Sequence, residues 1–361
     1  MSRRTLLVVV LVVTQAAGLA SGAPSRQRTS PSRQRPGPVA ALLMDVRTGR
    51  VLYARDIHRP WPPASTTKML TALIALERFP EDTVVTISPR AAAARSGTAI
   101  GLEAGEQWLL GDLVRAMLVH SANDAAVAVA EAVSGSVEKF AESMNARARE
   151  IGARESHFTN PNGLHDPGHY STAYDLAVIA RYALQQPAFA AIVRTQAWAL
   201  SRPDRPLQEF VNTNKLLRRY PGADGVKTGF TVASGHVLVA SATRDGWQLL
   251  AVVLKSQDMY RDTEQLLDYG FKTFTPVVVA GRGDALAMVP VGRRRGRLVA
   301  VVPADVVAVV WRGAAVSPKV TLRPGLRPPI PAGAPVGEVR FVEGQSVVAQ
   351  SILVAARRVG R

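Results

Sequence analysis

The alternation of apolar and polar residues changes its period along the chain, and these changes predict the structural elements. Residues 39–56 and the stretch that begins at Gly222 contain short apolar runs typical of strands, with turns at 46–49 and 244–246. Between them, apolar residues recur every three or four positions, which predicts helices over 65–78, 109–119, about 124–133, 137–152 and 173–186, and a last helix follows over 262–274. Strands that open and close a body of helices predict an α+β fold, in which a helical cluster flanks an antiparallel sheet.

The helical period disappears after about Phe274. Short valine-rich segments replace it, at 287–291, 297–303, 306–311, 319–324, 336–344 and 346–357. Such segments, separated by glycine and proline, are typical of strands. We therefore expect a small all-β domain over residues 276–361, next to a larger domain over residues 39–275.

The N-terminal residues predict export. A basic start, an apolar run from Leu6 to Val13 and a series of small residues indicate a signal peptide over residues 1–22, with an uncleaved anchor as the alternative. Residues 23–38 are polar, basic and rich in proline, which is typical of a linker. The expected location is the periplasm or another extracytoplasmic part of the cell envelope.

Composition limits the partners and cofactors. The chain has no cysteine, and His165 and His169 are separated by a proline and a glycine, so neither a metal site nor a cofactor is predicted. The net charge of +16 is concentrated at the ends, because residues 39–275 contain 25 basic and 24 acidic side chains. A nearly neutral body argues against nucleic acid as a partner. The basic ends would suit peripheral contact with an anionic membrane or envelope polymers, or they reflect an arginine-rich composition without a partner.

Three short motifs contain the candidate chemistry. Ser65-Thr-Thr-Lys68 opens a long apolar helix, Ser121-Ala-Asn123 separates two helical runs, and Lys227-Thr-Gly229 begins a strand. Each motif alone is weak, because Ser136-Val-Glu-Lys139 and Ser143-Met-Asn145 fit the same patterns in a polar helix. The order, settings and spacings of the three motifs together make the set specific.

The first motif can supply a nucleophile. Ser65 and Lys68 are three residues apart, so a helix places both on one face. Burial by apolar neighbours would lower the pKa of the lysine and favour the neutral amine, which can accept the serine proton. The competing interpretations are a helix N-cap for Ser65 and an exposed, snorkelling side chain for Lys68.

The motif set is that of class A β-lactamases and penicillin-binding proteins. Residues 39–275 resemble the latter, in particular the low-molecular-mass D-alanyl-D-alanine carboxypeptidases. Segments 159–180 and 222–231 and the β-rich C-terminal extension are also similar to that group. The resemblance implies a β-lactamase/DD-peptidase-like fold, peptidoglycan stem peptides as substrates and β-lactams as covalent inhibitors.

The resemblance also implies roles for the first two motifs. Ser65 would be the acyl-ester nucleophile and Lys68 its proton acceptor. Ser121 would relay a proton towards the leaving amine, whereas Asn123 would donate to a substrate carbonyl and steady Lys68. The competing interpretation of Ser121 and Asn123 is that they cap a loop.

The third motif would bind substrate. By resemblance, Lys227 and Thr228 hold the terminal carboxylate of the peptide, and the alternative for Lys227 is a charge that protects an edge strand. Gly229 would let a peptide pair along the strand. The backbone N–H groups of Ser65 and Phe230 would form the oxyanion hole. Relatives often have histidine where this chain has Phe230, so we expect a difference in pH behaviour or substrate preference.

The implied reaction is removal of the terminal D-alanine from a stem pentapeptide through an acyl-enzyme. A class A β-lactamase would need a glutamate base in an E-x-x-L-N segment, and residues 155–160 lack that spacing. Endopeptidase activity on cross-links and an inactive wall-binding protein remain the alternatives.

Overall fold

The computed structural model describes residues 37–202, 205–292 and 296–360. The predicted signal peptide and most of the predicted linker lie outside these residues. The described residues form two compact units: the first ends at Lys272, and the second begins at Thr273.

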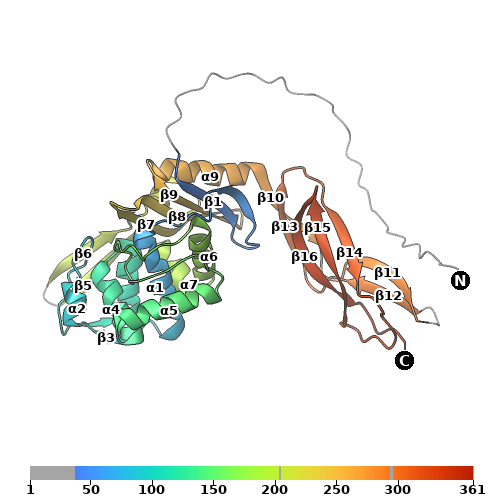
Figure 1. Ribbon diagram of the computed structural model, residues 1–361, viewed down its shortest axis with the longest axis horizontal. Helices are drawn as coiled ribbons and strands as arrows, with labels where there is room; N and C mark the ends of the chain where they lie inside the picture. Colours follow the sequence, from blue (N-terminus) through green and yellow to red (C-terminus); the bar gives the residue numbers. More distant parts are fainter. Residues whose placement is uncertain (1–36, 203–204, 293–295, 361) are drawn as a thin grey trace, which may run out of the picture. The chain divides into compact units, whose positions relative to one another are not determined.

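The first unit is built on a five-stranded antiparallel sheet in the order β2-β1-β9-β8-β7 (Figure 1). Its strands are β1 (Ala40–Asp45), β2 (Val51–Arg55), β7 (Ala223–Thr231), β8 (Gly235–Arg244) and β9 (Trp247–Ser256). The predicted turns at 46–49 and 244–246 join β1 to β2 and β8 to β9. Strand β7 lies at the edge of the sheet, where a further extended chain can pair with it.

Helices cover both faces of this sheet (Figure 1). Helix α9 (Met259–Thr273) lies on one face, where a Cβ on its Gly270 would meet the side chains of Leu43 and Leu249. The cluster on the other face contains α1 (Lys68–Arg78), α2 (Pro89–Ala93), α3 (Leu110–Arg115), α4 (Asn123–Ser134), α5 (Val137–Glu150), α6 (Ala173–Ala183) and α7 (Pro187–Val193). The short helix α8 (Leu216–Arg219) precedes β7, and its Arg219 pairs with Glu264 of α9. The central strands β8 and β9 are therefore buried on both sides, which explains their continuous apolar sequence.

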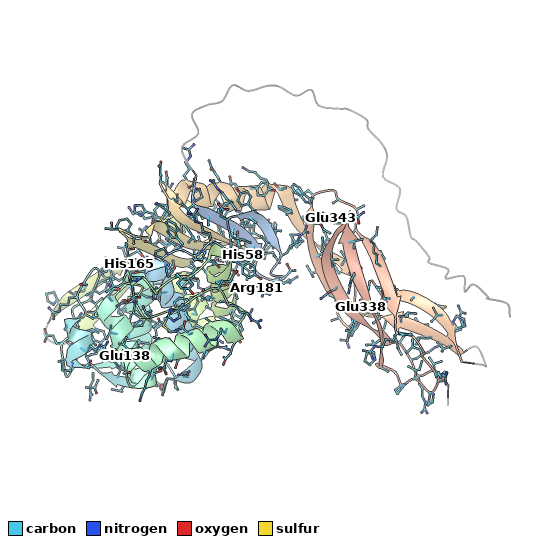
Figure 2. The ribbon with its side chains drawn as sticks, in the orientation of Figure 1. His58, Glu138, His165, Arg181, Glu338 and Glu343 are labelled. Atoms are coloured by element: carbon cyan, nitrogen blue, oxygen red, sulfur yellow. The ribbon has the colours of Figure 1, made fainter. Side chains whose placement is uncertain are left out.

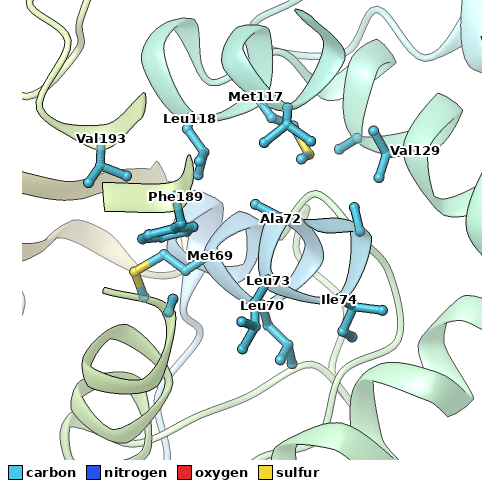
Figure 3. Packing of buried hydrophobic residues seen from close by; sticks show 14 of the residues in the cluster. Met69, Leu70, Ala72, Leu73, Ile74, Met117, Leu118, Val129, Phe189 and Val193 are labelled. Atoms are coloured by element: carbon cyan, nitrogen blue, oxygen red, sulfur yellow. The ribbon is translucent and has the colours of Figure 1, made fainter. Parts of the chain in front are cut away.

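Helix α1 runs through the core of the cluster (Figure 3). Every residue from Lys68 to Ala75 is buried, so the helix is enclosed on all sides. Met69, Leu70 and Leu73 pack here with Met117, Leu118, Phe189 and Val193. The lysine that opens the helix is thus drawn into an apolar interior by the residues that follow it.

Several features of this unit differ from the predicted elements, including the short helices α2, α7 and α8, which were not predicted. Residues 64–67 form a 3₁₀ turn (Ala64–Thr67) before α1, instead of the first turn of the α-helix. A π-helical turn (Ala116–His120) continues α3. Strands β5 (Ala197–Arg202) and β6 (Arg205–Val211) form a hairpin, and β3 (Val84–Thr86) pairs with β4 (Gln107–Leu109); neither pair was predicted, because these strands are short or largely exposed.

The second unit consists of strands, as predicted from about Phe274 onwards. Five of them form a sheet in the order β11-β12-β16-β15-β14, and two more pair as β10 and β13. Their bounds are β10 (Phe274–Ala280), β11 (Ala285–Val291), β12 (Gly296–Val301), β13 (Val306–Trp311), β14 (Ser317–Leu322), β15 (Pro335–Glu343) and β16 (Ser346–Ala355). Leu298, Val339 and Leu353 are fully buried in its core. The predicted α+β fold with an additional all-β part is confirmed.

Candidate active site

The Ser65 turn precedes helix α1 and is shaped by a left-handed residue. Ala64 has φ +49°, and Ser65 follows it inside the 3₁₀ turn. The N-cap positions of the 3₁₀ turn and of α1 are Pro63 and Thr67, so the interpretation of Ser65 as an N-cap is wrong. Ser65 instead presents its hydroxyl to the lysine one turn further along the chain.

Lys68 is fully buried and holds the Ser65 hydroxyl. Its Nζ lies 2.9 Å from Ser65 Oγ and donates to the carbonyl oxygen of Asn162 at 2.7 Å. Burial lowers the pKa of Lys68 well below its usual value, the charge of Lys227 lowers it further, and Asp124 opposes the shift. The alternative of a snorkelling surface lysine is therefore wrong.

A second buried lysine holds the second serine. Lys227 Nζ donates to Ser121 Oγ at 3.0 Å and to the carbonyl oxygen of Thr228 at 3.0 Å. Burial lowers its pKa to about 7. Although β7 is an edge strand, Lys227 is only 1% exposed, so it is not a charge that protects this edge from solvent.

Ser121 owes its position to an irregular helix end. The π-helical turn ends at His120, and Ser121 then adopts the left-handed conformation with φ +70° before α4 begins. This conformation is uncommon for a residue with a Cβ, and it occurs where the surroundings impose it, often at functional sites. The polar interruption in the sequence thus corresponds to a sharp change of direction that aims the hydroxyl at Lys227.

Asn123 is buried but does not contact Lys68. Its Nδ2 donates to the carbonyl oxygen of Ser96 at 2.6 Å, and its Oδ1 has no hydrogen-bond partner among the residues that the structure describes. The expected contact that steadies Lys68 comes instead from the carbonyl oxygen of Asn162. The Nδ2 contact with Ser96 fixes the orientation of the amide group, and in this orientation Oδ1 accepts no hydrogen bond from Lys68.

Two glycines enclose the Ser65 turn. A Cβ on Gly163, which has φ +83°, would lie 1.9 Å from the carbonyl oxygen of Ala64. A Cβ on Gly229 would lie 3.0 Å from the Ala64 Cβ and 3.1 Å from the Ser65 nitrogen. Gly229 was expected to leave room for a peptide, and it also allows β7 to approach the turn closely.

The segment that contains Asn162 packs against the turn and helix that carry Ser65 and Lys68, and no role for its individual residues was predicted. The carbonyl oxygen of Pro161 accepts from Thr71 Oγ1 at 2.7 Å. His169 is 2% exposed and lies between Thr67 Oγ1, at 2.8 Å from its Nε2, and the backbone N–H of Thr159, which donates to its Nδ1 at 3.0 Å. The turn-rich sequence of this segment was the available signal, but these contacts use backbone atoms that no motif specifies.

The lowered pKa of His169 predicts that the folded protein loses stability in acid. Burial lowers the pKa of His169 from 6.5 to about 4, so between these values the unfolded chain binds the proton and the folded chain does not. The contribution of the neutral His169 to the free energy of unfolding is complete above pH 6.5. It falls by about 3 kcal/mol as the pH decreases to 4. Denaturant unfolding at several pH values measures this loss.

The variant His169→Gln should flatten that pH dependence, whereas His165→Gln should leave it unchanged because His165 is exposed. Equal slopes for the wild type and His169→Gln would contradict the assignment.

The chain is open to solvent directly after the third motif, at Phe230. Thr228 Oγ1 donates to Thr213 Oγ1 at 2.8 Å, and Phe230 is 58% exposed. The Phe230 ring lies 4.7 Å from the ring of His236, its cross-strand partner on β8. An imidazole is therefore present beside the position where relatives often have histidine, although it comes from the neighbouring strand.

The duplicate motifs have structural roles. Ser136 is the N-cap of α5, where its Oγ accepts from the N–H of Lys139, so it does not lie within the helix as expected. Asn145 is only partly exposed and bonds the backbone of Phe158 through both Oδ1 and Nδ2. Neither motif has the buried lysine that distinguishes the site.

Comparison with known proteins agrees with this geometry. The sequence profile of the peptidase S11 family, D-alanyl-D-alanine carboxypeptidase, matches residues 28–258. The chain belongs to this family. Among the relatives of this carboxypeptidase family, D-alanyl-D-alanine carboxypeptidase DacF from Bacillus subtilis is 30% identical over 328 residues, which cover 88% of this chain and 84% of DacF.

A second relative, D-alanyl-D-alanine carboxypeptidase DacB2 from Mycobacterium tuberculosis, is 37% identical over 64% of this chain and 81% of its own length. Among solved structures, penicillin binding protein 5 from Haemophilus influenzae superposes with a TM-score of 0.79 at 28% identity, covering 92% of this chain and all of that one. The similarity to members of the carboxypeptidase family therefore extends into the β-rich second unit.

Proposed function

We infer that this chain is a serine-type D-alanyl-D-alanine carboxypeptidase of cell-wall metabolism that acts outside the cytoplasm on peptidoglycan peptides and binds β-lactams. The observation that supports this function best is the pair of buried lysines, each hydrogen-bonded to a different serine hydroxyl. A lysine whose pKa is lowered can be neutral at physiological pH and can accept a proton from a serine.

In the proposed first step, Lys68 Nζ takes the proton of Ser65 Oγ, and the oxygen attacks the carbonyl carbon of the penultimate D-alanine. The negative charge passes to the carbonyl oxygen, where the N–H groups of Ser65 and Phe230 stabilise it. The C–N bond then breaks, and the leaving nitrogen receives a proton through Ser121. Attack by water on the ester releases the shortened peptide and restores the serine.

The third motif selects substrates by the C-terminal end of the peptide. Lys227 and Thr228 bind the terminal carboxylate, because an ammonium beside a hydroxyl forms charge-assisted hydrogen bonds with it. This contact restricts the enzyme to peptides that end one residue beyond the scissile bond. In this proposal Asn123 donates to a substrate carbonyl with an N–H of its Nδ2.

The rival β-lactamase reaction lacks a base for deacylation. The carboxylate of Glu155, the glutamate in the comparable segment, lies 2.7 Å from Nδ1 of His58, and its side chain is 47% exposed. It is therefore occupied at the surface instead of activating a water at Ser65. A penicilloyl ester on Ser65 should consequently persist.

We also propose that the protein is exported and is held at the cell envelope by its basic residues. Residues 1–22 direct export as a signal peptide, residues 23–38 tether the catalytic domain of 39–275, and the basic β domain of 276–361 contacts anionic lipids or envelope polymers. Among the described residues, no single helix is long and apolar enough to cross a membrane. Release of the mature protein from membranes at low salt would contradict the electrostatic contact.

Mass spectrometry of a purified pentapeptide muropeptide tests the function. Incubation with the protein should remove one alanine, and prior treatment with penicillin should prevent this. Fluorescent penicillin should stay bound to the protein on a gel. An unchanged muropeptide would contradict the carboxypeptidase activity, whereas rapid loss of the label would favour a β-lactamase.

A further inference from the structure

Two residues near the site, Ile100 and Gly101, each have a backbone N–H group and a carbonyl group bonded by buried charged side chains. The N–H groups of Ile100 and Gly101 donate to the carboxylate of Asp124, at 3.1 and 2.9 Å from Oδ2. The carbonyl oxygens of the same two residues accept from the guanidinium of Arg202, which lies 3.1 Å from the oxygen of Gly101. Asp124 is fully buried and Arg202 is 7% exposed.

The Asp124 carboxylate is fixed by more than these two contacts. The N–H of Leu102 also donates to Oδ2 at 3.1 Å, and the N–H of Ala125 donates to Oδ1 at 2.9 Å. A carboxylate surrounded by backbone donors at the start of a helix is stabilised by those donors and by the helix dipole. Its loss would leave several buried N–H groups without an acceptor, which is costly.

The loop that Asp124 and Arg202 hold is the loop that positions Asn123. The N–H of Asn123 donates to the carbonyl oxygen of Thr98 at 2.7 Å, and its Nδ2 donates to that of Ser96 at 2.6 Å. Loop 96–102 therefore contacts Asn123 of the second motif at one end and Asp124, the residue after the motif, at the other. Since Ser121 lies two residues before Asn123, its position depends on the same contacts.

Arg202 links this loop to the hairpin of β5 and β6. Its guanidinium lies 5.0 Å from the centre of the Trp108 ring and 4.0 Å from a carboxylate oxygen of Glu106. The hairpin leads on to Thr213, whose hydroxyl accepts from Thr228. One buried arginine thus joins the second motif to the chain segment that contacts the third.

We propose that Asp124 and Arg202 are positioning residues, which clamp loop 96–102 and thereby hold Ser121 and Asn123 in the geometry needed for acylation of Ser65. This inference rests on the proposed function for its meaning, but its test can use penicillin acylation alone. Asp124 has a second, electrostatic effect, because its charge opposes the lowering of the pKa of Lys68.

The first test compares two arginine variants. Arg202→Met removes the clamp on the carbonyl groups and should slow acylation by fluorescent penicillin roughly ten- to a hundredfold, since a displacement of about 1 Å has effects of that size. Arg181→Met is the matched control, because Arg181 (labelled in Figure 2) also donates to two carbonyl oxygens, those of Val46 and Arg47, but at the β1–β2 turn. It should acylate at the rate of the wild type.

The second test uses the pH dependence of acylation. The charged and titratable groups that act on Lys68 and Asp124 include Lys227 and His120, whose imidazole packs against the ring of Phe210. Asp124→Asn removes the charge that raises the pKa of Lys68, so the acid limb of the pH–rate profile should move to lower pH. Arg202→Met should leave that limb in place. A purely structural role for Asp124 would change the rate without this shift.

The outcomes separate the proposals. Wild-type acylation rates in Arg202→Met, corrected for the folded fraction, would overturn the positioning role even if Asp124→Asn fails to fold. Equal losses in Arg202→Met and Arg181→Met would also overturn it. A wild-type protein that reacts with penicillin but removes no alanine would contradict the proposed function and leave this test valid.

Discussion

Replacement of Lys68 by arginine should reduce kcat/KM for the pentapeptide by about 10³-fold or more. Arginine keeps its proton at any physiological pH, so it cannot accept one from Ser65. Among the described residues, the hydrogen-bond partners of the buried lysine are the Ser65 hydroxyl and the carbonyl oxygen of Asn162, and the larger guanidinium would have to fit beside both. The rate of D-alanine release and the rate of penicillin acylation both measure the loss.

The matched control is Lys139→Arg, which makes the same change in the duplicate S-x-x-K motif on the surface of α5. It should retain the wild-type rate. Circular dichroism and the melting temperature establish whether Lys68→Arg is folded. A folded Lys68→Arg protein that released D-alanine at the native rate would exclude Lys68 as the proton acceptor.

The variant Lys227→Met should lower kcat/KM for peptides with a free terminal carboxylate by roughly a hundredfold. The terminal carboxylate loses its charged partner in this variant. A peptide with a C-terminal amide has no such partner in the wild type, so its kcat/KM should decrease much less. Because the pKa of Lys227 is about 7, kcat/KM of the wild type for the free peptide should fall as the pH rises above 7.

The exposed Lys255 of β9 provides the matched control for this second variant. Lys255→Met should keep both the preference for a carboxylate and its pH dependence. If Lys227→Met lost activity equally on the free peptide and on the amide, the lysine would serve Ser121 alone and would not select the chain end.

The predictions from sequence succeeded where side-chain identity and spacing carry the information. The three-residue separation of Ser65 and Lys68 and the apolar run after it, taken together with the other two motifs, predicted a buried amine beside a hydroxyl. The apolar runs of β8 and β9 likewise identified two strands and the turn between them. In these cases the pattern itself determines which groups leave water.

Other parts of the site could not be predicted because backbone atoms form the hydrogen bonds that hold them. The partner that steadies Lys68 is the carbonyl oxygen of Asn162, 94 residues away, and any residue type has such an oxygen. Asp124 stands directly after the second motif, yet its partners are N–H groups of a loop. The hairpin that supplies Arg202 was missed because it is largely exposed, with Leu207 at 70%, and its alternation is weak.

The close fit around Ala64 limits how this enzyme could escape a drug. A bacterium that acquires β-lactam resistance by mutating a target must hinder the antibiotic while it keeps the natural reaction. At position 163 an added methyl group would overlap the carbonyl oxygen of Ala64, in the turn that bears the nucleophile, and at position 229 it would be in tight contact with that turn. Position 163 is therefore closed to that evolutionary route.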